Sequence, residues 1–227
     1  MVPEEKIKVR IRFSKTGDLM YISHLDLART MQRIILRAGL DIWYSEGFNP
    51  QPKMVFAVPL PTGVESNCEM LDIKLNSPMS SEEIKNRLND NLPTEMRVLD
   101  VYTPEVKFKE IAYIDYTIKL NSPKITGETA GKIKALFDGE CMITKKTKSG
   151  EKEVNISEYI KLLEVDSKSG YAEIHTILAS GNEMNLSPEL LIEALRRKLD
   201  LMTSERIDEY YSIMRNEMLT STLEKFI

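Results

Sequence analysis

Residues 7–13 read Ile-Lys-Val-Arg-Ile-Arg-Phe, with apolar and basic side chains in strict alternation. A period of two is typical of a β-strand with one buried face, and here the opposite face is basic. The polar turn 14–18 follows, and Ser23 with Asp26 then forms a helix-start signal. Apolar residues recur at helical spacing over 27–38, and Gly39 suits the end of that helix.

The same reasoning, carried along the chain, predicts strand, helix, two strands, helix, strand up to about residue 102. Within this half, residues 40–44 and 53–57 are expected to be short strands, and the second helix is expected to begin at Ser80 or Ser81. The C-terminal half repeats the theme and ends in a strand over 210–219. We therefore expect an α+β protein with two ferredoxin-like (split βαβ) halves packed together, residues 1–103 and 110–227.

Composition excludes several classes of protein. The 227 residues carry a net charge of −4, yet residues 1–60 hold nine basic against six acidic residues, leaving 22 against 29. Nucleic acid could therefore bind only locally, through the first third. Cys68 and Cys141 lie far apart, which excludes a disulfide framework and argues against an iron–sulfur cluster or a structural zinc site built by this chain alone. We therefore expect no bound metal. With no apolar signal segment and no apolar run long enough for a membrane, we expect a cytoplasmic protein without a membrane contact.

Cofactor and catalytic motifs are scarce. Residues 127–132 resemble a phosphate loop but are one residue short between the glycines, and no dinucleotide fingerprint or hydrolase elbow occurs. We therefore expect no cofactor. His24, at the positive end of the first helix, would be held neutral and could act as a general base, or it could be an ordinary surface histidine. His175 alternates with strand residues and is expected to be structural.

Arginines and aromatic residues are interleaved in the first third of the chain. Arg29, Arg33 and Arg37 recur at i, i+4 and i+8 on the predicted helix, either as a solvated face or as a phosphate-binding stripe. Arginines beside aromatic rings suit single-stranded RNA, which is recognised by stacking and backbone contacts. The candidate RNA-binding residues are Arg12, Ser23, Arg29, Arg33, Arg37, Trp43, Ser45, Phe48, Asn49 and Lys53.

The segment 44–53, Tyr-Ser-Glu-Gly-Phe-Asn-Pro-Gln-Pro-Lys, is a loop by its turn residues. Pro50 and Pro52 stiffen it, and Asn49 can close an Asx turn. Two interpretations stay open: a rigid binding platform, or a structural crossover held by Phe48 in the core. For the first, we expect the early arginines and this loop to form one concave surface.

Several of these motifs resemble one family. Residues 12–15 (Arg-Phe-Ser-Lys), 21–27 (Tyr-Ile-Ser-His-Leu-Asp-Leu), 37–40, 44–53 and 59–66 are similar to the radical SAM-linked proteins, the family of the DUF2344 domain. Weaker downstream matches are 180–182 and 214–217, where Met214 stands in place of the histidine expected before Arg215. The resemblance implies a bacterial protein that works beside, or fused to, a radical SAM enzyme, in a translation or RNA-modification setting.

Three functions remain open from the sequence. The first is an accessory subunit that binds RNA or a ribonucleoprotein for a radical SAM enzyme, because this chain lacks the cysteine pattern of the SAM cluster. The second is a metal-independent RNA-processing or modifying enzyme that uses His24. The third is a structural partner that docks an acidic protein surface against the basic stripe.

Overall fold

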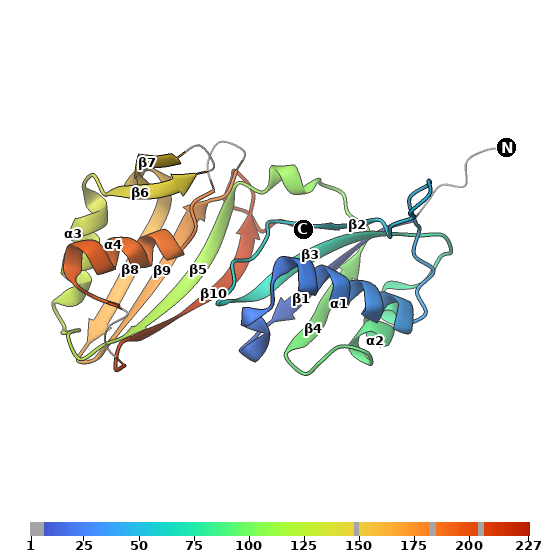
Figure 1. The fold of residues 1–227 in the computed structure, drawn as a ribbon, viewed down its shortest axis with the longest axis horizontal. Coiled ribbons are helices and arrows are strands. Elements are labelled where there is room, and N and C mark those ends of the chain that lie inside the picture. Colours follow the sequence, from blue (N-terminus) through green and yellow to red (C-terminus); the bar gives the residue numbers. More distant parts are fainter. Residues whose placement is uncertain (1–6, 148–149, 182–184, 204–206) are drawn as a thin grey trace. The chain divides into compact units, whose positions relative to one another are not determined.

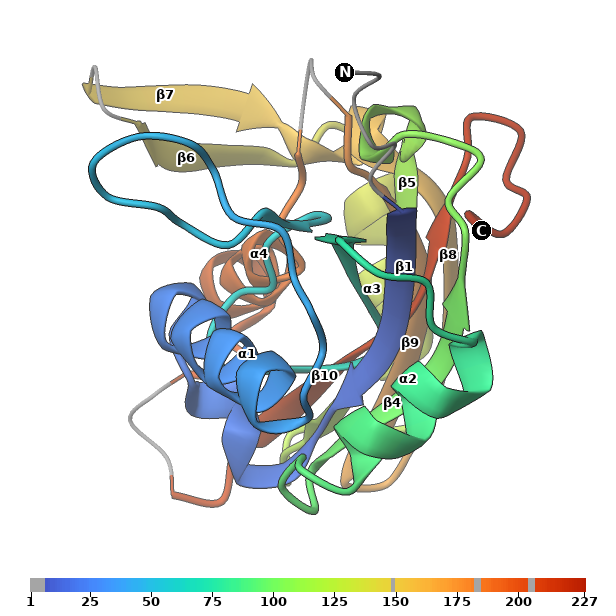
Figure 2. The same ribbon diagram turned by 90° about the vertical axis from the view of Figure 1, so that its right-hand side faces the viewer.

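The computed structural model describes residues 7–147, 150–181, 185–203 and 207–227. These residues form a mixed fold of four α-helices and mostly antiparallel β-sheet. The fold divides into two compact units (Figures 1 and 2). Unit 1 contains the described residues up to Phe108 together with Ile227, and unit 2 contains Lys109–Phe226. None of the described helices is long and apolar enough to cross a membrane.

Unit 1 contains four strands and two α-helices. In chain order they are β1 (Ile7–Lys15), the short 3₁₀ helix η1 (Gly17–Tyr21), α1 (His24–Arg37), β2 (Met54–Phe56), β3 (Val64–Leu75), α2 (Ser81–Asn89) and β4 (Met96–Tyr102). The strands lie in the order β4-β1-β3-β2, and every neighbouring pair is antiparallel. A second short 3₁₀ helix, η2 (Phe108–Glu110), follows β4.

The alternation in β1 sets the two faces of this sheet. Val9, Ile11 and Phe13 lie in the core together with the buried side of α1, whereas Arg10 and Arg12 lie on the opposite face. The predicted helix signals are confirmed: the Ser23 hydroxyl accepts the backbone N–H of Asp26 at 3.1 Å, and α2 begins after Ser80 in the same way.

One predicted strand is shorter than expected. Residues 40–44 form isolated bridges, Ile42 to Leu75 and Tyr44 to Pro52, instead of a continuous strand. The reason is that this segment changes its hydrogen-bond partner at Trp43. The Trp43 N–H donates to the Lys74 carbonyl on β3, whereas the Trp43 carbonyl accepts the Lys53 N–H. The 53–57 prediction holds for β2, Met54–Phe56.

Unit 2 has a related order of elements. They are β5 (Tyr113–Asn121), α3 (Thr129–Asp138), the hairpin β6 (Met142–Thr147) and β7 (Gly150–Asn155), the 3₁₀ helix η3 (Ile156–Tyr159), β8 (Ile160–Lys168), β9 (Tyr171–Ala179), α4 (Glu189–Leu199) and β10 (Tyr210–Leu219). Strands β10-β5-β9-β8 form an antiparallel sheet, beside which Figure 1 shows α3 and α4. The sequence also predicts a hairpin of residues 142–147 and 152–156 with a basic tip at 148–150, and of this tip residues 148–149 lie outside the described residues.

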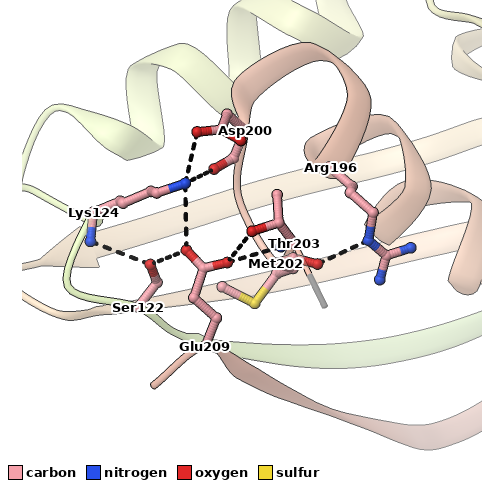
Figure 3. Close-up of polar contacts among 7 residues, drawn as sticks. All are labelled: Ser122, Lys124, Arg196, Asp200, Met202, Thr203 and Glu209. Carbon is pink, nitrogen blue, oxygen red and sulfur yellow. Dashed lines mark hydrogen bonds and ion pairs between the residues drawn. The ribbon is translucent and has the colours of Figure 1, made fainter. Parts of the chain in front are cut away.

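A buried carboxylate organises one end of unit 2 (Figure 3). Glu209, whose side chain is fully buried, accepts hydrogen bonds from the Ser122 hydroxyl at 2.8 Å and from the backbone N–H and hydroxyl of Thr203 at 2.8 and 3.0 Å. Lys124 lies 3.8 Å from the same carboxylate and 2.6 Å from Asp200. Burial alone would raise the pKa of Glu209, but these hydrogen bonds and the Lys124 charge lower it overall.

A histidine joins three strands of unit 2. His175 on β9 lies 3.0 Å from Asp115 on β5 and 3.5 Å from Glu164 on β8, measured from its two ring nitrogens. Asn216 on β10 donates to the same Asp115 oxygen at 2.8 Å. Burial disfavours the charged ring, but the hydrogen bonds and charges of Asp115 and Glu164 outweigh it and raise the pKa of His175.

We expect Glu209→Gln to destabilise the protein by about 1–3 kcal/mol at pH 7. One carboxylate oxygen that accepts hydrogen bonds would be replaced by an amide NH₂ group, which cannot accept them, so a buried donor would lose its partner. Since the pKa of Glu209 is lowered on folding, its contribution is present above its unfolded pKa of about 4.3 and is lost as the pH falls through the folded value. Urea unfolding at pH 7 and at pH 3 measures both effects. The control, Asp200→Asn at a 78 % exposed side chain, should cost less than about 0.5 kcal/mol. Equal costs in the two variants would contradict this account.

We expect the His175 contacts to stabilise the protein at acidic pH and not at alkaline pH. A raised folded pKa means that the contribution is fully present below the unfolded pKa of about 6.5 and is lost as the pH rises through the folded value. The side chain is 39 % exposed, so the loss in His175→Gln should stay below about 1 kcal/mol. Urea unfolding of both proteins at pH 5.5 and pH 9 provides the comparison. A difference that grows with pH would show that the sign is wrong.

Candidate functional site

The loop between α1 and β2 is a closed hairpin with an exposed tip. Its two sides are joined by the Lys53 N–H to the Trp43 carbonyl at 2.9 Å and by the Ser45 N–H to the Gln51 carbonyl at 2.8 Å. The Ser45 hydroxyl also accepts the Gln51 N–H at 2.9 Å, and the Asn49 side chain accepts from the Gln51 amide at 3.1 Å. These bonds, rather than an Asx turn, fix the loop.

Phe48 lies at the tip of this loop and is fully exposed, at 112 % of its reference area. The interpretation that Phe48 holds the loop in the core is therefore wrong. The two prolines and the backbone bonds between the two sides of the hairpin hold the loop without it.

Arg10 lies completely buried on the face of the unit 1 sheet opposite α1. Its guanidinium forms two hydrogen bonds with the Asp72 carboxylate, at 2.7 and 2.9 Å, and donates to the Val106 carbonyl at 2.9 Å. The guanidinium carbon of Arg10, Cζ, also lies 4.3 Å from the centroid of the Phe108 ring. Arg10 thus holds the segment 104–108 against the sheet.

Beside this segment lies an open groove of about 560 Å³, which we call the Trp43 groove. Trp43 is half-buried in its wall, and the Nζ atoms of Lys74 and Lys53 lie 4.9 and 5.8 Å from the centroid of its ring. The other lining residues come from β1, β2, β3 and the segment after β4: Lys8, Val55, Asp72, Ile73, Pro104, Glu105, Val106, Lys107 and Phe108.

The Trp43 groove is locally basic although the chain is acidic. Four lysines line it against two carboxylates, and one of these, Asp72, is paired with Arg10. A concave surface with one sign of charge attracts oppositely charged ligands even when the net charge of the protein does not. Apolar side chains, among them Val55 and Val106, provide the rest of the surface. The groove can therefore accept a ligand that is both planar and anionic.

A second groove of about 570 Å³ lies on the helix side of the same sheet edge, between α1 and the segment 51–59, and we call it the α1 groove. His24 lies in it, with its ring edge-on to Phe56 at 5.2 Å and 80°. In the described part of the chain no hydrogen bond or ion pair involves the His24 ring, and no three His, Cys, Asp or Glu side chains are placed to hold a metal ion.

The predicted site residues do not form one concave surface. Trp43 and Lys53 line the Trp43 groove, whereas Arg29 lines the α1 groove and forms an exposed ion pair with Asp26 at 3.4 Å. Arg12 lies on the sheet face opposite α1 and lines neither groove.

Arg33 and Arg37 are exposed and line neither groove. Helical geometry explains this separation, because each step of four residues turns the stripe by about 40° further around α1, away from the groove that Arg29 reaches. Ser23 is used as the cap of α1, and Ser45 and Asn49 bond within the loop.

Among the lining residues of the Trp43 groove that the sequence analysis missed, the basic and aromatic ones are Lys8, Lys74, Lys107 and Phe108. The alternation of Lys8 and Lys74 with apolar residues could have predicted that both point away from the core. The two residues lie opposite each other in the register of β1 and β3. Lys107 and Phe108 carried no such signal, since they follow the last predicted strand of unit 1 and reach the groove only because the segment folds back onto Arg10.

Comparison with known proteins gives a family but no activity. No curated protein matches the chain. A crystal structure of an unknown protein from Galdieria sulphuraria aligns over 93 % of this chain and 99 % of its own, at 10 % identity and a TM-score of 0.27. The model of the family described as uncharacterized protein conserved in bacteria (DUF2344) matches residues 8–188, and the chain therefore belongs to this family.

Proposed function

We propose that unit 1 binds single-stranded RNA in the Trp43 groove. The observation that carries the proposal is Trp43 itself, set in a concave surface with the ammonium groups of Lys53 and Lys74 within 6 Å of its ring. An unstacked base can lie against the indole while neighbouring phosphates contact the lysines. The tip residue Phe48 adds a second exposed ring on the same loop.

The arrangement of strands supports this use of the sheet. Unit 1 places its strands in the order fourth, first, third, second, and unit 2 places β5, β8, β9 and β10 in the same relative order. We assign both units to the ferredoxin-like class on this basis. RNA-recognition modules of related topology bind RNA on the sheet face through aromatic residues, and this analogy of fold supports the proposal.

The proposed role is that of an accessory subunit, located in the cytoplasm, which presents RNA to a radical SAM enzyme. The family resemblance supplies this partner. The composition agrees, because Cys68 and Cys141, both buried, are the two cysteines of the chain and are fewer than a SAM cluster requires.

We expect single-stranded RNA to quench the fluorescence of Trp43, the single tryptophan in the chain, on titration with a short oligonucleotide. Affinities of variants follow from the anisotropy of a labelled oligonucleotide. Trp43→Ala should weaken binding by about 5- to 150-fold, since stacking contributes about 1–3 kcal/mol per base, and Trp43→Phe should recover part of the loss. Lys8→Gln and Lys107→Gln should each lower the slope of log K against log salt by about 0.7.

The control is Lys134→Gln, an exposed lysine on α3 outside the groove, which should leave the affinity within about twofold. A flat salt dependence together with an unchanged Trp43→Ala variant would reject RNA binding at this groove. If RNA affinity falls only in the double variant Arg33→Ala/Arg37→Ala, and not in the groove variants, the RNA binds on the outer face of α1 instead. Cleavage of the RNA that disappears in His24→Ala would favour the enzyme hypothesis instead.

We also expect this chain and the radical SAM protein that the family resemblance implies as its partner to elute together in gel filtration at micromolar concentration. A dissociation constant below the micromolar loading concentration is needed for the two proteins to elute as one complex. Separate elution of the two proteins, with and without the RNA oligonucleotide, would reject a stable complex.

A further inference from the structure

Strand β2 forms an edge of the unit 1 sheet, and its outer backbone groups have no hydrogen-bond partner in the part of the chain that the structure describes. It pairs with β3 alone, and the Ala57 N–H donates to the Met70 carbonyl at 3.0 Å. In an antiparallel pair the bonded positions alternate, so Val55 also bonds toward β3 while the N–H and C=O groups of Met54 and Phe56 point outward. No hydrogen bond to these outward groups occurs within the described residues. The edge is therefore available for another strand.

The α1 groove runs along this edge on the helix side of the sheet. Its walls include Leu25 and Ala28 of α1, Phe56 of β2 and Pro59 beyond it. Leu25 is 59 % exposed although it is a large apolar side chain. An apolar side chain bound in this groove would be removed from water together with the Leu25 side chain, and this burial of apolar surface favours binding.

The opposite side of the same edge has a different chemistry. Val55 is 57 % exposed and lines both grooves, and Lys53 lies beside it in the wall of the Trp43 groove. Because successive side chains of a strand point to opposite faces, a strand added to β2 would place one side chain in the α1 groove and the next near Lys53. The first position suits an apolar residue and the second an acidic one.

We propose that β2 binds an extended peptide segment of a protein partner, with alternating apolar and acidic residues, as an additional strand. Outward N–H and C=O groups spaced two residues apart select this occupant, because a peptide backbone offers a donor and an acceptor at that spacing and a nucleic acid does not. The peptide site is distinct from the Trp43 stacking site, and the peptide needs no RNA in order to bind.

The test uses the full chain, labelled with ¹⁵N, and a blocked hexapeptide of alternating Val and Glu. On saturation, the amides of Met54 and Phe56 should exchange with solvent at least about tenfold more slowly, because they become hydrogen-bonded. The same peptide with N-methylated Val residues, or with Lys in place of Glu, should bind at least about tenfold more weakly. Leu25→Ala should weaken the unmodified peptide by about tenfold.

The matched control is Leu36→Ala, another exposed leucine of α1, 48 % exposed, which lines neither groove and should change the affinity by less than about twofold. Failure of the peptide to bind at millimolar concentration, unchanged exchange of the two amides, or equal binding of the N-methylated peptide would each overturn the proposal. RNA binding by Leu25→Ala is measured in parallel, so that failure of the peptide site is distinguished from failure of the RNA site.

Discussion

The Trp43 groove depends on Arg10. A fully buried guanidinium is tolerated only where charge and hydrogen-bond partners surround it, and removing one partner of such a pair costs about 3–5 kcal/mol. Asp72 supplies the charge from the neighbouring strand, and the Val106 carbonyl supplies a further acceptor from the segment that follows β4. The need to satisfy Arg10 therefore draws residues 104–108 onto the sheet. This creates a wall for the groove and brings Lys107 and Phe108 to it.

Local sequence signals predicted the elements of unit 1 because each signal has a local physical cause. The alternation of residues 7–13 determines which side chains of β1 pack into the core with α1. Ser23 satisfies a backbone donor at the start of α1, and Gly39, with φ of +70°, adopts the left-handed conformation that ends it. The region 40–44 was misjudged for the opposite reason: whether it pairs continuously depends on Lys53 and Lys74, which are remote in sequence.

The site could be predicted only in part. Trp43 and Lys53 were found because aromatic and basic residues cluster in the stiff loop, and both line one groove. The arginine stripe was grouped with them on sequence proximity, but proximity along the chain does not determine the face of an element. Arg12 follows the phase of β1 to the side opposite α1, and Arg33 follows the helical turn away from Arg29. Contacts that join separate segments, such as Arg10 to Phe108, leave no periodic trace.

The two proposed sites share one strand, and this has a physical consequence. Val55 lines both grooves, and the Lys53 ammonium lies near the Trp43 ring. A peptide added to β2 would place acidic side chains close to this same ammonium group. Placing carboxylates near Lys53 reduces the positive potential available to RNA phosphates, so the two ligands oppose each other through charge. If both proposed ligands bind, thermodynamic linkage would make the effect reciprocal, and RNA in the groove would weaken peptide binding by the same factor.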